Sequence, residues 1–90
     1  MPNEGPLPEE GKLIGEISHY FGKIGVAVIK LKDTLKVGDQ IRIVGGVTDF
    51  TQTVESMEIE HQKVEKAGSG DSVGLKVSQK VREGYKVYKL

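Results

Sequence analysis

Aromatic and basic side chains that could bind an anionic polymer fall in two stretches of this chain. The first stretch has three consecutive rings, His19, Tyr20 and Phe21, closely followed by Lys23. The second stretch is basic, and its members are Lys76, Lys80, Arg82 and Lys86. Because rings stack on unpaired bases and cations track phosphates, these residues predict a binding face for RNA. They are equally compatible with a solvated charged surface beside rings that belong to the core.

The charge balance gives this face mild support. The formal net charge is zero, with 13 basic and 13 acidic residues. Residues 1–10 hold three glutamates and no basic residue, so the other 80 residues carry 13 basic against 10 acidic side chains. This excess falls well short of the strong basic patch of a dedicated nucleic-acid binder.

Groups for catalysis, metal binding or nucleotide binding lack the required spacing. The two histidines, His19 and His61, are too few for a zinc site, which takes three or four protein ligands. The chain has no phosphate-binding G-x-x-x-x-G-K-[ST] loop, and the D-x-x-G match at 71–74 is interpreted as a turn. No serine has an evident activating base. We expect no catalytic residue, no metal, no cofactor, no GTP and no enzymatic activity.

The sequence also predicts where the chain resides and how it is divided. No apolar run approaches the roughly 18–20 residues of a membrane span, and the N-terminus lacks the features of a signal peptide. Without cysteine, the chain needs no oxidising compartment. We expect a cytoplasmic protein with no membrane partner. Residues 1–11, rich in proline and glutamate, predict a flexible leader, and residues 12–90 a single domain.

The elements that must position these side chains are marked by a short pattern that occurs three times. Each copy has a glycine just before a β-branched run, and the copies lie at 36–41, 68–73 and 81–87. Glycine reaches positive φ without steric strain, and an adjacent aspartate can bond nearby backbone and hold a turn. Asp39 and Asp71 fill that place in the first two copies, and Tyr85 in the third. The chain is therefore expected to turn sharply and begin a strand three times.

Alternating and apolar runs between these turns predict short strands. We expect strands over 13–20, 24–31, 40–44, 50–60, 72–77 and 85–90, a short strand or turn over 64–67, and a loop over 61–63. Neither parity of 50–60 is wholly apolar, which indicates a twist or bulge there, and a helix over 54–66 is the alternative. The pattern predicts an all-β fold, a barrel or a sandwich. We expect a small closed barrel of six to seven strands, since closure removes exposed edges.

The order of these segments resembles the second, β-barrel domain of translational GTPases of the elongation factor Tu type. The matching segments cover roughly residues 13–90, and they are 25–28, 35–45, 54–57, 67–75 and 81–87. The chain is also similar to small translation elongation factor-like proteins that consist of this barrel alone. The resemblance implies a non-catalytic, stand-alone binding module associated with translation or RNA. Its implied partners are tRNA, the ribosome or a translation factor.

Two positions depart from that family where it holds the aminoacylated end of tRNA. His19 stands in place of a phenylalanine in the first strand, and Ser72 in place of an asparagine in the turn at 70–74. Both departures argue against such a pocket. The alternative function is a protein-interaction module that docks on a larger enzyme or factor, because barrels of this type recur as accessory domains, for example at the ends of collagenase-like peptidases.

Overall fold

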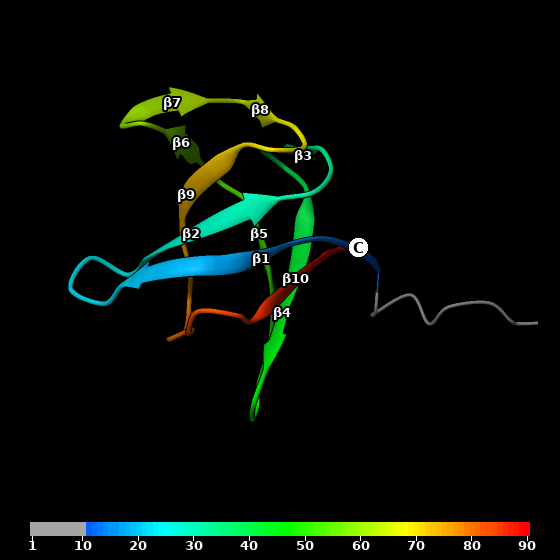
Figure 1. Cartoon of the computed structure of the whole chain (residues 1–90), viewed down its shortest axis with the longest axis vertical. Coiled ribbons are helices and arrows are strands. Elements are labelled where there is room, and N and C mark those ends of the chain that lie inside the picture. Colours follow the sequence, from blue (N-terminus) through cyan, green and yellow to red (C-terminus); the bar gives the residue numbers. More distant parts are fainter. Residues whose placement is uncertain (1–10) are drawn as a thin grey trace, which may run out of the picture.

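The computed structural model describes residues 11–90, and the elements within them are all β-strands (Figure 1). The predicted leader over 1–11 lies outside the described residues except for Gly11. The strands are β1 Lys12–Phe21, β2 Val26–Leu31, β3 Leu35–Lys36, β4 Gln40–Gly45, β5 Thr48–Thr53, β6 Met57–Ile59, β7 Gln62–Val64, β8 Lys66–Ala67, β9 Ser72–Lys76 and β10 Lys86–Lys89. The all-β prediction is thus confirmed, and the alternative helix over 54–66 is wrong.

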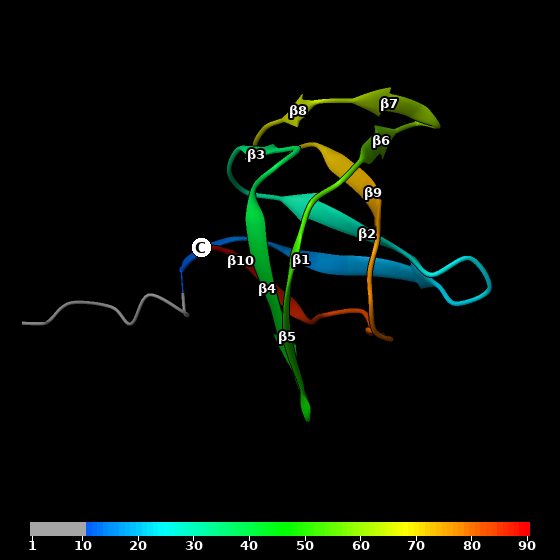
Figure 2. The ribbon, with the colours of Figure 1, turned by 180° about the vertical axis from the view of Figure 1, so that it is seen from behind.

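The predicted closed barrel is also wrong. An eight-stranded antiparallel sheet runs in the order β5-β4-β10-β1-β2-β9-β6-β7, with β5 and β7 at its two edges, and β3 pairs with β8 in a separate ladder. Figure 1 and Figure 2 show β4 and β5 crossing β1 and β2 at a steep angle, so the sheet coils without closing. The expected strand over 50–60 ends at Thr53, and the chain resumes pairing at Met57. This break divides the strand that a closed barrel would need.

The three glycine turns form as predicted. In each turn the N–H of the fourth residue donates to the carbonyl of the first, at 3.1, 3.0 and 3.2 Å, in 36–39, 68–71 and 82–85 respectively. The third residue is a glycine with φ of +99°, +93° or +92°, as a type II turn requires. Asp39 and Asp71 also accept the N–H of the first residue through a carboxylate oxygen, at 2.9 Å in both turns.

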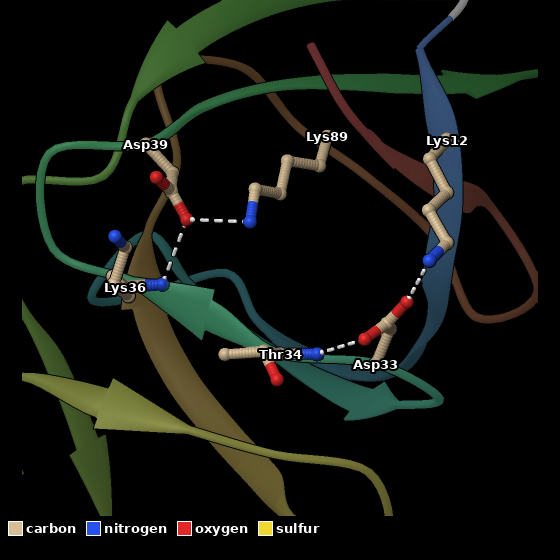
Figure 3. A network of polar contacts seen from close by, with 6 residues as sticks. All are labelled: Lys12, Asp33, Thr34, Lys36, Asp39 and Lys89. Carbon is tan, nitrogen blue, oxygen red and sulfur yellow. Dashed lines mark hydrogen bonds and ion pairs between the residues drawn. The ribbon is translucent and has the colours of Figure 1, made fainter.

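Figure 3 shows how the first turn is tied to its surroundings. The carboxylate of Asp39 accepts the Lys36 N–H and lies 3.5 Å from the ammonium of Lys89. Beside it, Asp33 accepts the N–H of Thr34 at 2.7 Å and pairs with Lys12. These contacts connect the loop after β2 to the first residue of β1, and the turn between β3 and β4 to the last residue of β10.

The core lies inside the coiled sheet, and no polar or charged residue among the described ones is buried. Alternation along β2 directs Ala27 and Ile29 inward, while a bulge in β1 between Ile17 and His19 resets the side-chain direction before Tyr20. The largest fully buried side chains are Ile14, Ile17, Ile29, Leu35, Ile41, Ile43, Met57, Val54, Val73 and Val87. Residues 11–90 contain no helix that could cross a membrane.

Candidate protein-docking surface

The structure divides the predicted RNA-binding residues among several places. His19 and Phe21 lie on the outer face of β1, with ring centroids 4.3 Å apart in an edge-on contact. His19 Nδ1 is also 3.3 Å from a carboxylate oxygen of Glu83. The side chain of Tyr20 points to the opposite face of β1 and packs against the core. Lys23 is exposed in the turn between β1 and β2.

The basic stretch is divided as well. Lys80 and Arg82 line a depression of about 760 Å³ together with Tyr20 and Tyr85. The other two lysines lie elsewhere: Lys76 lines a different depression, and the ammonium of Lys86 is 3.7 Å from Glu16. The structure therefore brings Tyr20 together with Lys80 and Arg82, and it does not form the single aromatic and basic face that the sequence predicted.

An exposed apolar surface lies elsewhere, on the outer side of β1 and β2. Four side chains form it, and we call them the outer apolar patch: Phe21, Ile24, Val26 and Val28. Phe21 is 46% exposed and Ile24 is 60% exposed, while the two valines are half-buried. A depression of about 450 Å³ lies over the patch. Exposed apolar residues are ordinary when isolated, but a contiguous group in a depression indicates an interaction site.

Local sequence explains why the patch is there. Residues 24–29 are apolar on both parities, so β2 presents Ala27 and Ile29 to the core and Val26 and Val28 to the other face. Gly74, which pairs with Val28 across β2 and β9, adds no side chain to the floor of the depression. A run that is apolar on both parities needs cover on both faces, and that signal could have revealed the patch from the sequence.

One side of the depression is acidic. Glu58, Glu60 and His61 line it, and within residues 11–90 neither glutamate has an ion-pair partner. Glu60 and His61 form the two-residue loop between β6 and β7, with φ of 51° and 69°, as in a type I′ hairpin turn. The predicted loop over 61–63 is therefore shorter, because Gln62 and Lys63 already belong to β7. A partner with an apolar centre and a basic margin would fit this surface.

The depressions hold no evident metal site. Among the described residues, no three histidine or carboxylate side chains gather in a group that could hold a metal ion. The pKa shifts also lie away from the outer apolar patch, since the carboxyls with a lowered pKa are Asp33, bonded to Lys12, and Asp49, bonded to Arg42. What this surface offers is contact area and charge.

Comparison with known proteins identifies proteins that contain a similar segment. Over 78 residues the chain is 44% identical to an uncharacterized protease of Methanocaldococcus jannaschii, an alignment that covers 86% of this chain and 19% of the protease. Over 78 residues it is 37% identical to a collagenase of Porphyromonas gingivalis, covering 84% of this chain and 22% of the collagenase. The chain thus spans about a fifth of the length of these curated relatives. No protein-family model matches it.

A solved structure shows the same fold. The C-terminal domain of a putative U32 peptidase from Geobacillus thermoleovorans superposes with a TM-score of 0.83 at 21% sequence identity. The superposition covers 87% of this chain and 99% of that domain. The fold of this chain is therefore similar to that of this C-terminal domain.

These findings overturn the resemblance to the second domain of elongation factor Tu. The relatives are named protease and collagenase, and neither is a translation factor. The resemblance rested on the order of five segments, three of which contain the glycine turns, and such turns report local backbone geometry that small β domains of unrelated function share. The prediction of an elongation factor-like, translation- or RNA-associated module is wrong. The expectation of tRNA, the ribosome or a translation factor as partner rested on this resemblance and therefore loses its basis.

The expectation that the chain is not an enzyme also loses support. The relatives carry the names of proteases, yet the matched segment is only about a fifth of each. Catalysis is therefore neither assigned to residues 11–90 nor excluded. The alternative prediction, a protein-interaction module on a larger enzyme, agrees better with the relatives.

Proposed function

We propose that this chain is an accessory domain of a larger peptidase of the U32 type and docks on the rest of that polypeptide through the outer apolar patch. The observation that carries the proposal is the contiguous exposure of Phe21 and Ile24 over half-buried Val26 and Val28. The relatives support it, because most of their length lies outside the matched segment and offers a surface to cover the patch.

The chemistry of the patch defines the surface that it would meet. Covering an exposed Phe or Ile side chain contributes roughly 1.5–3 kcal/mol when the whole side chain is buried, and proportionally less at half exposure. Glu58 and Glu60 at the margin favour lysine or arginine on the opposing surface. The larger protein would act on polypeptides, in keeping with the names protease and collagenase of the relatives.

The proposal is tested with the M. jannaschii protease from which its own matching segment has been removed. Calorimetry measures its association with this 90-residue chain. We expect the double variant Phe21→Ser and Ile24→Ser to weaken the association by roughly ten- to a hundredfold, since each 1.4 kcal/mol lost is tenfold in the dissociation constant. Glu58→Lys should weaken the association more at low salt than at high salt, because salt screens the charge interaction.

The matched control is Val47→Ser. Val47 is fully exposed in the loop between β4 and β5 and does not line the depression, so its substitution should leave the association unchanged. Equal binding by the wild-type chain and the Phe21 and Ile24 double variant would refute docking through this patch.

A further inference from the structure

A side-chain amide joins the edge strand β5 to the chain that follows β9. Gln52 Nε2 donates to the carbonyl of Lys76 at 2.7 Å, and the N–H of Ser78 donates to Gln52 Oε1 at 2.9 Å. Between these residues, Val77 donates its N–H to the carbonyl of Gly25 at 3.0 Å, toward the β2 side. Residues 76–78 therefore have one edge paired with main chain and the other satisfied by a side chain.

The two bonds of Gln52 are those that a neighbouring strand would make. In a strand parallel to 76–78, the residue beside Val77 would donate its N–H to the carbonyl of Lys76. Its own carbonyl would accept the N–H of Ser78. The Gln52 carboxamide supplies the same donor and acceptor from a planar group of the same chemistry as a peptide. Gln52 thus occupies hydrogen-bonding positions that belong to a strand edge.

The other side of this gap is a strand edge as well. β5 is the outermost strand of the sheet. Gly45 pairs with Thr48 next to the two-residue loop, so alternation along the ladder directs the main-chain groups of Asp49, Thr51 and Thr53 away from β4. A depression of about 370 Å³ lies here, and both Thr53 and Ser78 line it.

We infer that this gap binds an extended polypeptide segment by strand addition. Its main chain takes over the carbonyl of Lys76 and the N–H of Ser78 from Gln52 and pairs with the free edge of β5. A polypeptide is the occupant that fits, because alternating N–H and C=O groups are what two strand edges recognise. Because the affinity of strand addition comes from main-chain hydrogen bonds, the site should tolerate variation in the side chains of the segment.

This site is separate from the outer apolar patch. The two depressions share no lining residue. Loss of docking through the patch would therefore leave strand addition intact, and loss of strand addition would leave docking intact.

The probe is a short synthetic peptide of alternating Thr and Val with a Lys at each end. Backbone amide shifts of the full chain are followed by NMR during titration. We expect saturable shifts at Thr51, Thr53 and Ser78, and their loss when alternate amides of the peptide are N-methylated. Gln52→Ala removes the competing amide and should strengthen binding several-fold.

Thr51→Pro is the blocking variant, because proline is tolerated on an edge strand where the N–H points away from the ladder. Thr51→Ala is its matched control, since it removes the same side chain and keeps the N–H. We expect Thr51→Pro to abolish peptide binding and Thr51→Ala to preserve it. Both variants retain Gln52, so the inference can be tested even if Gln52→Ala fails to fold.

Four results would overturn the inference. Shifts confined to other strands would show binding elsewhere. Equal effects of Thr51→Pro and Thr51→Ala, or no binding, would show that the β5 edge is not used. Shifts at the gap that grow with protein concentration without peptide would show that a second copy of the chain occupies it.

Discussion

The ring of Tyr85 lies against the main chain of Gly45, so closely that a Cβ atom on Gly45 would fall 2.1 Å from Tyr85 Cδ1 and 2.4 Å from Cγ. Gly45 ends β4, and Tyr85 directly precedes β10, which pairs with β4. The missing side chain at 45 is what lets a half-buried ring lie over the junction of two strands. The same ring lines the depression that holds Lys80 and Arg82.

Gly45→Ala should destabilise the domain by about 1–3 kcal/mol, because the ring or the strand must move to admit the methyl group. Urea unfolding followed by circular dichroism measures the change. In a Tyr85→Ala background the same substitution should have a much smaller effect. Equal losses in the two backgrounds would mean that the contact with the ring is not the cause.

Two glycines in the turn at 68–71 test whether backbone strain alone makes a glycine necessary, because both positions have space for a side chain. Gly70 has φ of +93° and Gly68 does not have positive φ, while neither would bring a Cβ within 4 Å of another group. We expect Gly70→Ala to cost about 1–2 kcal/mol and Gly68→Ala to be neutral or stabilising by about 0.4–1 kcal/mol. Thermal unfolding of both variants checks this, and similar losses would contradict it.

One residue type at two depths tests the division between core and outer patch. Ile29 is fully buried and Ile24 is 60% exposed. Ile29→Ala should lower the free energy of unfolding by about 2–5 kcal/mol through lost burial and a cavity. Ile24→Ala should change it by no more than about 0.5 kcal/mol. Denaturant titration measures the free energy of unfolding of the two variants. A large decrease in Ile24→Ala would show that Ile24 belongs to the core.

The pKa of Asp49 should depend on Arg42. Hydrogen bonds from Arg42 Nε at 2.7 Å and Nη2 at 2.5 Å hold the pKa of this carboxyl below its ordinary value of 3.8. The folded state thus binds the proton less readily than the unfolded state. The contribution of the pair to stability is present above pH 3.8 and is lost as the pH falls through the lower folded value.

Carboxyl chemical shifts recorded during acid titration measure that pKa. In Arg42→Gln the pKa of Asp49 should rise toward its ordinary value, while that of Asp33, lowered by its hydrogen bond to Lys12, should stay low. Asp33 is the internal control. An unchanged Asp49 titration in Arg42→Gln would show that the guanidinium does not set it.

Local features of this fold were predictable from the sequence and the long-range ones were not. The turns at 36–39 and 68–71 each depend on a glycine followed directly by an aspartate, so short-range chemistry identifies them. Closure of the barrel depends on whether β5 pairs with a strand far away in the sequence. The break in pairing after Thr53 bears on that long-range contact, and no local pattern reports it. Alternation within 50–60 hinted at an interruption but did not distinguish a bulge from a break.

The candidate site was missed for a related reason. Sequence reasoning grouped His19, Tyr20 and Phe21 because they are adjacent, whereas a strand sends neighbours to opposite faces. The bulge after Ile17 then fixed which of them points inward. The apolar residues on both parities of 24–29 were the better signal, since they imply a face that needs a partner.

The pairing of β1 with β10 has a mechanical consequence. Lys12 lies opposite Lys89, so the chain enters and leaves the domain at the same end of one antiparallel ladder, and Figure 1 shows the C-terminus beside the start of β1. A tether pulling on both ends would load the hydrogen bonds of this ladder one after another, along their own direction, rather than all together in shear. Under tension the domain should therefore unzip at low force, beginning at Lys12 and Lys89.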